Sequence, residues 1–222
     1  MRERPIFFAA PMVRALLDGS KTQTRRLVPT WQQPNHEPSP DFPDMAWRAV
    51  AQRNRRWGFA VFGSNAEECA VALADSGCCP YGRPGDRLWV RETVADVGAR
   101  LTYRADIGDG AHCMVKRWTP SIHMPRWASR ILLEIVSIHV ERLQDISEPD
   151  CLAEGVRAIQ HEGDGTYYHY EHTHADPGNW CDVDTAYQHL WENINGVGSW
   201  DANPWVWVVE FKRVGTKEGD EL

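Results

Sequence analysis

A lysine and a threonine close together in the sequence are the residues best suited to carry chemistry. The segment Gly19–Arg26 contains one lysine, two threonines and two arginines, and its Lys21 and Thr24 are three positions apart. In a tight turn, or in the first turn of a new element, such side chains can point the same way. A desolvated lysine has a lowered pKa and can take a proton from a hydroxyl, which activates the hydroxyl as a nucleophile. The alternative is a solvated basic turn.

A short strand and a short helix must position this segment. Pro5–Ala10 contains an apolar run and predicts the first strand. Apolar residues in Met12–Leu17 recur at helical spacing, and Pro11 suits a first helical turn. We expect the helix to run to about Asp18, because Gly19 can adopt the left-handed conformation of a C-cap without a steric penalty.

A second helix is expected far along the chain, after the longest strand-like run. Ile131–Leu143 has apolar residues on both faces, as in a central strand of a barrel. Ser147 is a suitable N-cap, Asp150 completes a capping box and Gly155 ends the helix. Glu154 lies at the end of this helix, where a negative charge opposes the helix dipole. Its position alone therefore predicts a solvated acid at the surface rather than a functional residue.

The remaining regular elements follow from alternation and helical spacing. Arg83–Asp86 predicts a turn, and the strand after it has Leu88 and Val90 on one face. The other face of that strand carries Arg87, Trp89 and Arg91. Further elements are expected at Leu101–Ala105 (strand), Val183–Asn193 (helix) and Asn203–Val214 (strand).

A proline-bounded loop, Trp118–Arg130, is rich in aromatic and basic residues. Trp118 or Trp127 could stack on a base, and Arg126 or Arg130 could hold a phosphate. The alternative is a packed loop whose tryptophans close the barrel, since tryptophans are usually buried.

Two stretches interrupt the regular pattern and are expected to be insertions, at about 30–78 and 158–182. The first begins with a proline-rich polar stretch that indicates a loop or arm. Met45–Phe62 is basic and aromatic, and we expect a helix followed by a strand at Trp57–Phe62. It either contacts nucleic acid or packs its tryptophans on the barrel. The second stretch is expected to be a long inserted loop that either is mobile or covers the cleft of the site.

Two groups of metal-ligand residue types occur in these insertions. The first is Cys69, Cys78 and Cys79, and the second is His169, His172, His174 and Cys181. Neither spacing matches a standard zinc pattern, so we expect no metal.

Composition limits the classes of function. The chain has 222 residues and a net charge of -7, so any contact with nucleic acid must use a local basic patch. No apolar run is long enough to span a bilayer, and the N-terminus lacks the apolar stretch of a signal peptide. Six irregularly spaced cysteines do not form a disulfide framework, so a cytoplasmic location is expected.

Four features together resemble the ASCH superfamily, including its phage-encoded members. The motif Gly-x-Lys-x-x-(Glu/Thr)-x-Arg is filled by Gly19, Lys21, Thr24 and Arg26. The strand after Gly85 is similar to the family's G-D-x-L-x-V strand, and the last strand is similar to its P-x-V-x-x-V-E-F strand. Glu154 falls on the glutamate near the end of the family's short helix.

The resemblance implies a fold and a reaction. The fold is α+β, a small, mostly antiparallel PUA-like β-barrel with flanking helices; it forms one domain over residues 1–214 with the two insertions, followed by a polar tail at 215–222. The branch with threonine in the motif comprises bacterial N(4)-acetylcytidine amidohydrolases. By resemblance, Lys21, Thr24 and Glu154 are catalytic, without a metal or another cofactor. The expected substrate-binding residues are Arg25, Arg26, Trp89, Arg91, Trp118, Arg126 and Trp127.

A binding function is the alternative, because ASCH and PUA-like domains are associated with RNA. In that case the same arginines and tryptophans contact phosphates and bases of single-stranded RNA, with or without ribonuclease activity. The expected partner is therefore a modified nucleoside or single-stranded RNA, and no membrane is expected.

Overall fold

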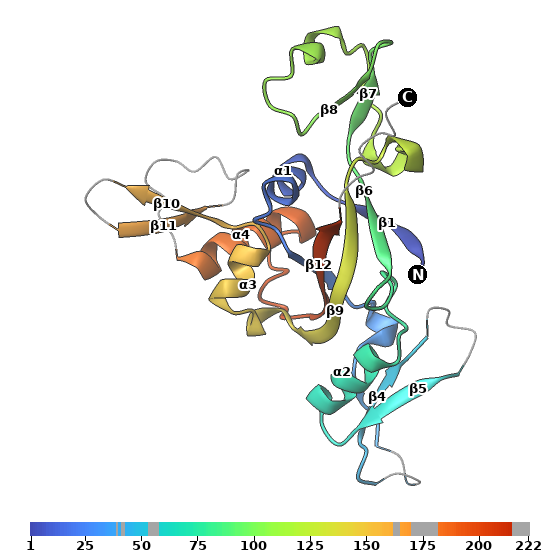
Figure 1. Cartoon of the computed structure of the whole chain (residues 1–222). Helices are drawn as coiled ribbons and strands as arrows, with labels where there is room; N and C mark the ends of the chain where they lie inside the picture. Colours follow the sequence, from blue (N-terminus) through green and yellow to red (C-terminus); the bar gives the residue numbers. More distant parts are fainter. Residues whose placement is uncertain (39, 41–42, 53–57, 162–164, 170–181, 215–222) are drawn as a thin grey trace.

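A five-stranded sheet forms the centre of the computed structural model (Figure 1). The structure describes residues 1–38, 40, 43–52, 58–161, 165–169 and 182–214. The strand order is β1-β6-β9-β12-β2, and only the β1–β6 pair is parallel. The strands are β1 (Glu3–Phe7), β2 (Gln23–Leu27), β6 (Arg87–Arg91), β9 (Leu132–Arg142) and β12 (Trp205–Val214).

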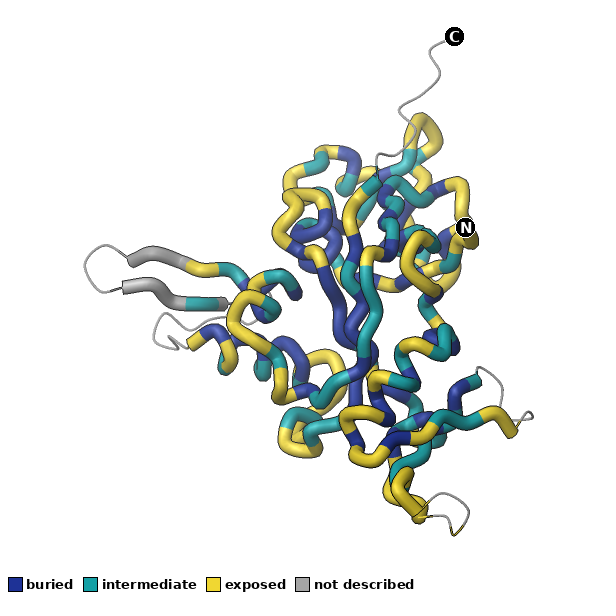
Figure 2. Tube along the Cα trace, turned by 60° about the horizontal axis from the view of Figure 1, so that its bottom comes forward, coloured by how far each residue is buried: buried dark blue, intermediate teal, exposed yellow. Residues whose placement is uncertain are grey.

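Three helices gather on one face of this sheet (Figure 1). They are α1 (Ala10–Asp18), α3 (Glu148–Ala153) and α4 (Val183–Asn195). Their apolar side chains share a core with alternate residues of the strands, such as Leu88 and Val90 of β6. Figure 2 shows the central strands as largely buried.

The first insertion covers part of the other face and is more ordered than the sequence predicts. It contains β3 (Asn35–His36), β4 (Trp47–Val50), β5 (Ala60–Gly63) and α2 (Ala66–Asp75). The prediction of a helix at the start of Met45–Phe62 is wrong, because β4 pairs with both β3 and β5. Trp205 and Trp207 of β12 are buried beneath this insertion. The apolar area that they contribute explains why a proline-rich segment folds as a layer rather than an arm.

The local signals around the two short helices are confirmed. Gly19 caps α1 with a φ of 84°, in the left-handed region. Ser147 and Asp150 form the expected capping box at the start of α3. These two features fix the chain on either side of the turn that carries Lys21 and of the helix end that carries Glu154.

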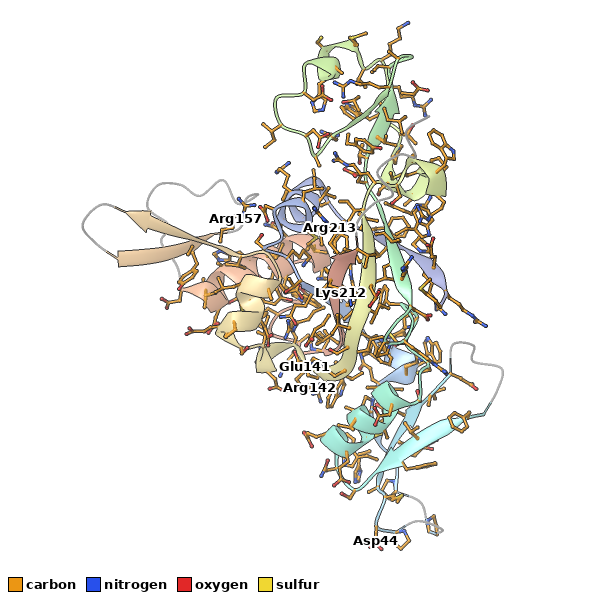
Figure 3. The ribbon with its side chains drawn as sticks, viewed as in Figure 1. Asp44, Glu141, Arg142, Arg157, Lys212 and Arg213 are labelled. Atoms are coloured by element: carbon orange, nitrogen blue, oxygen red, sulfur yellow. The ribbon has the colours of Figure 1, made fainter. Side chains whose placement is uncertain are left out.

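The fold is α+β and mostly antiparallel, as the sequence predicts. Within the described residues, β1 and β2 are the edges of the main sheet, so these strands do not close a barrel. Two arms extend from the centre: β7 (Val94–Asp96) with β8 (Leu101–Tyr103), and β10 (Arg157–His161) with β11 (Gly165–His169). The β10–β11 hairpin corrects the prediction that 158–182 is entirely loop. Arg157, labelled in Figure 3, pairs with Asp18 and ties this hairpin to α1.

Among the helices that the structure describes, none combines the length and apolar character needed to cross a bilayer.

The capping box generates a prediction about stability. Ser147→Ala removes the acceptor for the backbone N–H of Asp150, and we expect the free energy of unfolding to fall by about 1 kcal/mol. Urea denaturation measures the change, and Ser121→Ala, in the 3₁₀ turn Ser121–His123, is the matched control. Equal stability of the two variants would contradict a role for the cap in holding α3.

Candidate active site

The Lys21 ammonium and the Glu154 carboxylate form a buried ion pair. Lys21 Nζ lies 2.6 Å from Glu154 Oε2 and donates a second hydrogen bond, of 2.8 Å, to the Glu154 carbonyl oxygen. Both residues are almost completely buried. The turn after α1 is tied to α3 through its backbone as well, because the Thr22 N–H donates to the Ala153 carbonyl at 2.8 Å.

The open edge of β2 supplies the second partner of Glu154. The Thr22 carbonyl accepts from the Phe211 N–H, and the Val28 N–H donates to the Trp205 carbonyl, so the even-numbered residues of β2 and its flanks bond to β12. Backbone groups alternate in an antiparallel pair, so the Arg25 N–H points away from β12. Glu154 Oε1 accepts this N–H. The free edge of the sheet therefore orients the carboxylate.

Arg25 adds a buried positive charge among several carboxylates. Its guanidinium lies 2.7 Å from Glu141 Oε1, 3.3 Å from Asp150 Oδ2 and 3.6 Å from Glu154 Oε1. Burial opposes the charged form, but attraction by Glu154 and Glu141 outweighs it and raises the pKa of Arg25. Glu141 is at the end of β9, next to Arg142 (Figure 3).

The pKa of Lys21 moves in the opposite direction. Complete burial lowers it, and the positive charges of Arg26 and Arg25 act in the same direction. The carboxylate of Glu154 raises it but does not compensate for the desolvation. Lys21 therefore gives up its proton more readily than an exposed lysine does.

A cavity of about 200 Å³ lies beside the ion pair, between the β2 edge, α1 and α4. Thr24, Arg25, Arg26 and Glu154 line it. Lys21 is not part of its wall, so the lysine is linked to the cavity through the Glu154 carboxylate. Thr24 and Glu154 can touch a ligand, whereas Lys21 can act only through Glu154.

The remaining wall of the cavity is aromatic and aliphatic. Tyr81, Tyr187 and Trp191 contribute rings, and Met12 and Leu190 contribute aliphatic surface. Burial raises the pKa of Tyr187 well above 10, so its hydroxyl stays neutral. A flat heterocycle fits such a wall, because aromatic rings stack on planar π-systems.

Three buried donors of residues that line this cavity have no hydrogen-bond partner within the described structure. They are Nη1 of Arg25, Nε of Arg26 and Nε1 of Trp191. Buried donors are normally paired, and an unpaired one is unfavourable by about 1–3 kcal/mol.

The structure divides the predicted site residues into two groups. Thr24, Arg25, Arg26 and Glu154 line the cavity, and Lys21 lies behind Glu154. The other five are absent from its wall: Trp89, Arg91, Trp118, Arg126 and Trp127. Trp118 instead packs edge-on against His112. Strand alternation points Trp89 and Arg91 away from the core on β6, Arg126 lies against the Trp89 ring, and Trp127 is largely exposed.

Sequence reasoning missed Tyr187 and Trp191. Their helical spacing correctly placed them on the buried face of α4. That periodicity distinguishes buried from exposed positions, but it does not show that part of the buried face borders a cavity.

A larger and more open cavity, of about 660 Å³, lies elsewhere, between β1 and the first insertion. Arg2, Arg4 and Arg83 line it together with Asp86. It does not contain the Lys21–Glu154 pair, so its size alone does not make it the reaction site.

The described residues contain no group of three or more His, Cys, Asp or Glu side chains placed to hold a metal ion. The thiols of Cys69, Cys78 and Cys79 are buried and are not in disulfide bonds, and burial raises the pKa of Cys69 to about 11. Of the second predicted group, His172, His174 and Cys181 lie outside the described residues.

Comparisons of the chain with models of protein families, with curated proteins and with solved structures found no match. Function is therefore inferred from the geometry of the site itself.

The buried ion pair generates a prediction about coupling. Lys21→Met and Glu154→Gln each leave a buried partner uncompensated, and we expect each to lower the free energy of unfolding by about 3–5 kcal/mol. The double variant should lose less than the sum, because neither charge remains alone. Urea denaturation of the four proteins measures the coupling.

The exposed Arg48–Glu37 pair, at 2.9 Å, is the matched control. We expect Arg48→Ala to change the free energy of unfolding by less than about 1 kcal/mol. Additive effects of the Lys21 and Glu154 substitutions would show that the two side chains do not act as a unit.

Proposed function

We propose that the chain is an ASCH-type amidohydrolase with a PUA-like fold, and that it hydrolyses the N-acyl group of an acylated cytosine nucleoside without a metal. One observation carries the proposal: Lys21 and Glu154, 133 positions apart, are 2.6 Å from one another beside a small cavity that Thr24 also lines. The proposal combines this convergence with the family resemblance of the sequence.

The order of the elements supports the finer fold assignment. The signature turn follows α1 and leads into the edge strand β2, and Glu154 follows α3. The last strand, β12, pairs with β2 and completes the wall behind Thr24. This is the arrangement that the resemblance implies, with the first insertion added on the outer side of β12.

The cavity supports a small, flat substrate. Its volume of about 200 Å³ is below the range of roughly 300–1,000 Å³ typical of pockets for drug-sized ligands. One pyrimidine base with a short acyl group suits this volume and the aromatic wall better than a long acyl chain does.

Two donors that make no hydrogen bond within the described structure supply the polar part of recognition. When a nucleophile attacks the acyl carbonyl, negative charge develops on the carbonyl oxygen. Arg25 Nη1, which is ion-paired with Glu154 Oε1 at 3.6 Å but makes no hydrogen bond, and Trp191 Nε1 are two of the buried donors of the cavity residues, and we assign them to this oxygen. Their positions are fixed before the reaction by the Arg25 ion pairs and by the packing of α4.

Proton transfer then runs through Glu154. Thr24 attacks the acyl carbon and forms an ester, or it positions a water that attacks directly. In either case Glu154 accepts the proton of the nucleophile, and Lys21, 2.6 Å behind it, can hold that proton. The proton returns to the exocyclic nitrogen of cytosine as the C–N bond breaks, and water supplies the oxygen of the released carboxylate. Lys21 is therefore a positioning residue that stores a proton, because it does not touch the substrate.

A module that captures a modified base without chemistry is the second candidate. One observation favours this second candidate: Lys21 and the Arg25 N–H occupy both carboxylate oxygens of Glu154, and a purely structural ion pair has the same contacts. Turnover separates the two candidates.

The first functional prediction concerns acetate release from N(4)-acetylcytidine, followed by mass spectrometry. Thr24→Val and Glu154→Gln should each lower kcat/KM by about a hundredfold or more, as expected for a nucleophile-positioning group and a general base. Arg48→Ala is the control on the insertion and should retain full activity. Full activity of Thr24→Val would exclude the proposed site.

The pH profile tests the role of Lys21. Its pKa is lowered by burial, so the wild-type rate should rise with pH as Lys21 loses its proton and then level off. Lys21→Met should lose this rise as well as activity, whereas a purely structural lysine would leave the shape of the profile unchanged.

The last prediction for this site concerns Trp191→Phe, which keeps an aromatic ring and removes the Nε1 donor. We expect kcat to fall by about ten- to a thousandfold, with a smaller change in KM, because the bond strengthens as charge develops on the oxygen. Steady-state kinetics measure both constants. A change confined to KM would assign Trp191 to substrate packing alone.

A further inference from the structure

The cavity of about 660 Å³ between β1 and the first insertion is basic, and the proposed reaction does not use it. The cavity shares no lining residue with the cavity beside Glu154. Arg2, Arg4 and Arg83 line it, and Asp86 is the one carboxylate among its described lining residues. Its volume is within the range of roughly 300–1,000 Å³ that is typical of pockets for small molecules. We call it the arginine cavity.

The β1 strand brings Arg2 and Arg4 to the arginine cavity. Ile6 of β1 is buried in the main core. Side chains alternate along an extended chain, so Arg4 and Arg2 lie on the same face as Ile6. The Arg87 N–H donates to the Arg2 carbonyl at 2.8 Å, which holds Arg2 alongside the start of β6. The inward-facing row of β1 therefore changes from apolar to cationic where the core gives way to the cavity.

The first insertion holds Arg83 at the wall of the arginine cavity. Gly77, which also lines the cavity, follows the end of α2 and has a φ of 68°. A Cβ at this position would overlap the Arg83 guanidinium, so the guanidinium lies directly against the Gly77 backbone. The carbonyl end of a helix attracts a cation. Arg83 is therefore positioned before any ligand arrives.

Asp86 does not neutralise these arginines by direct pairing. Its Oδ1 accepts the backbone N–H of Arg2 at 2.8 Å. This hydrogen bond, with a further one from the Arg83 backbone, holds the pKa of Asp86 below its usual range, so the carboxylate stays charged. Within the described residues, none of the three guanidinium groups is in a salt bridge, and Arg4 donates instead to the Pro80 carbonyl at 3.3 Å. Three guanidinium groups and one carboxylate leave two positive charges in excess.

We propose that the arginine cavity binds a small phosphorylated molecule with a sugar-like body. A guanidinium matches the geometry of phosphate oxygens and binds them by charge-assisted hydrogen bonds. A phosphate monoester carries a charge of about -1.5 to -2 at pH 7, which balances the excess of positive charge in the wall. The described lining residues include no aromatic ring on which a base could stack, whereas Gln52 offers a polar side chain to a hydroxyl group.

Calorimetric titration of the full chain with ribose 5-phosphate tests this proposal without any turnover. Arg2→Gln and Arg83→Gln should each weaken binding about tenfold or more, the loss expected for one charge-assisted hydrogen bond. Arg2 is the safer of the two substitutions, because only its backbone makes hydrogen bonds within the described structure. Urea denaturation of each variant checks that it is folded.

Two arginines outside the arginine cavity provide matched controls. Arg48→Gln removes a guanidinium from the first insertion, and Arg26→Gln removes one from the cavity beside Glu154. Both variants should bind ribose 5-phosphate as the wild type does. Ribose lacks the phosphate and should not bind, and malonate, a dianion without phosphorus, should bind at least tenfold more weakly.

Each outcome of the titration decides the inference. Binding of ribose 5-phosphate that depends on Arg2 and Arg83 but not on Arg48 or Arg26 supports it. Absence of binding by the wild type at millimolar concentration overturns it, as does an equal loss in Arg26→Gln, which would place the ligand in the other cavity. Equally tight binding of malonate overturns the assignment to phosphate. Tighter binding of a short single-stranded DNA through the same arginines overturns the assignment to a small molecule.

Discussion

The buried Lys21–Glu154 ion pair is the constraint on which the rest of the site depends. Removing two charges from water has an effective penalty of several kcal/mol for each ion, so the pair persists only where its remaining donors and acceptors are satisfied. Lys21 Nζ has two acceptors from Glu154, and the carboxylate has a further donor in the Arg25 N–H. Each of these contacts requires a particular backbone feature: the stop of α1 at Gly19, the end of α3 and the free edge of β2.

The same free edge explains why a cavity exists at this place. A strand that paired on both sides would have no N–H available for Glu154 and would leave no space for a ligand. Here α4 packs near the edge without adding a strand, and its Tyr187 and Trp191 complete the wall of the cavity. The first insertion is on the opposite side, where it buries Trp205 and Trp207 and covers part of the outer surface of the sheet. On the outer face of β6, Trp89 and Arg91 are partly buried and pack against each other.

Features fixed by neighbouring residues were predictable from the sequence, and features fixed by distant packing were not. The C-cap at Gly19 and the capping box at Ser147 follow from local backbone chemistry, and both are present. The meeting of Lys21 with Glu154 was expected only through the family resemblance, because no spacing rule connects residues so far apart. The insertion was misread because proline and polar residues describe its first part, whereas its fold depends on the pairing of β4 and on burial under α2. Alternation correctly placed Trp89 and Arg91 on one face of β6, but it does not tell which face borders the cavity.

Because Lys21 lies behind Glu154, the two residues have different roles in the proposed reaction. A lysine that touched the substrate would have to be neutral and directly beside the scissile bond, and a carboxylate at 2.6 Å would oppose that neutrality. In the proposed reaction Glu154 lies between Lys21 and the substrate. The Lys21–Glu154 pair can then share one proton and deliver it to the cavity through the Glu154 carboxylate. Desolvation lowers the pKa of Lys21, so the lysine releases its proton more readily. The ion pair and the Arg25 N–H hold the Glu154 carboxylate in place. In the proposed reaction the lysine and the glutamate therefore act as one acid–base unit, and only the glutamate contacts the substrate.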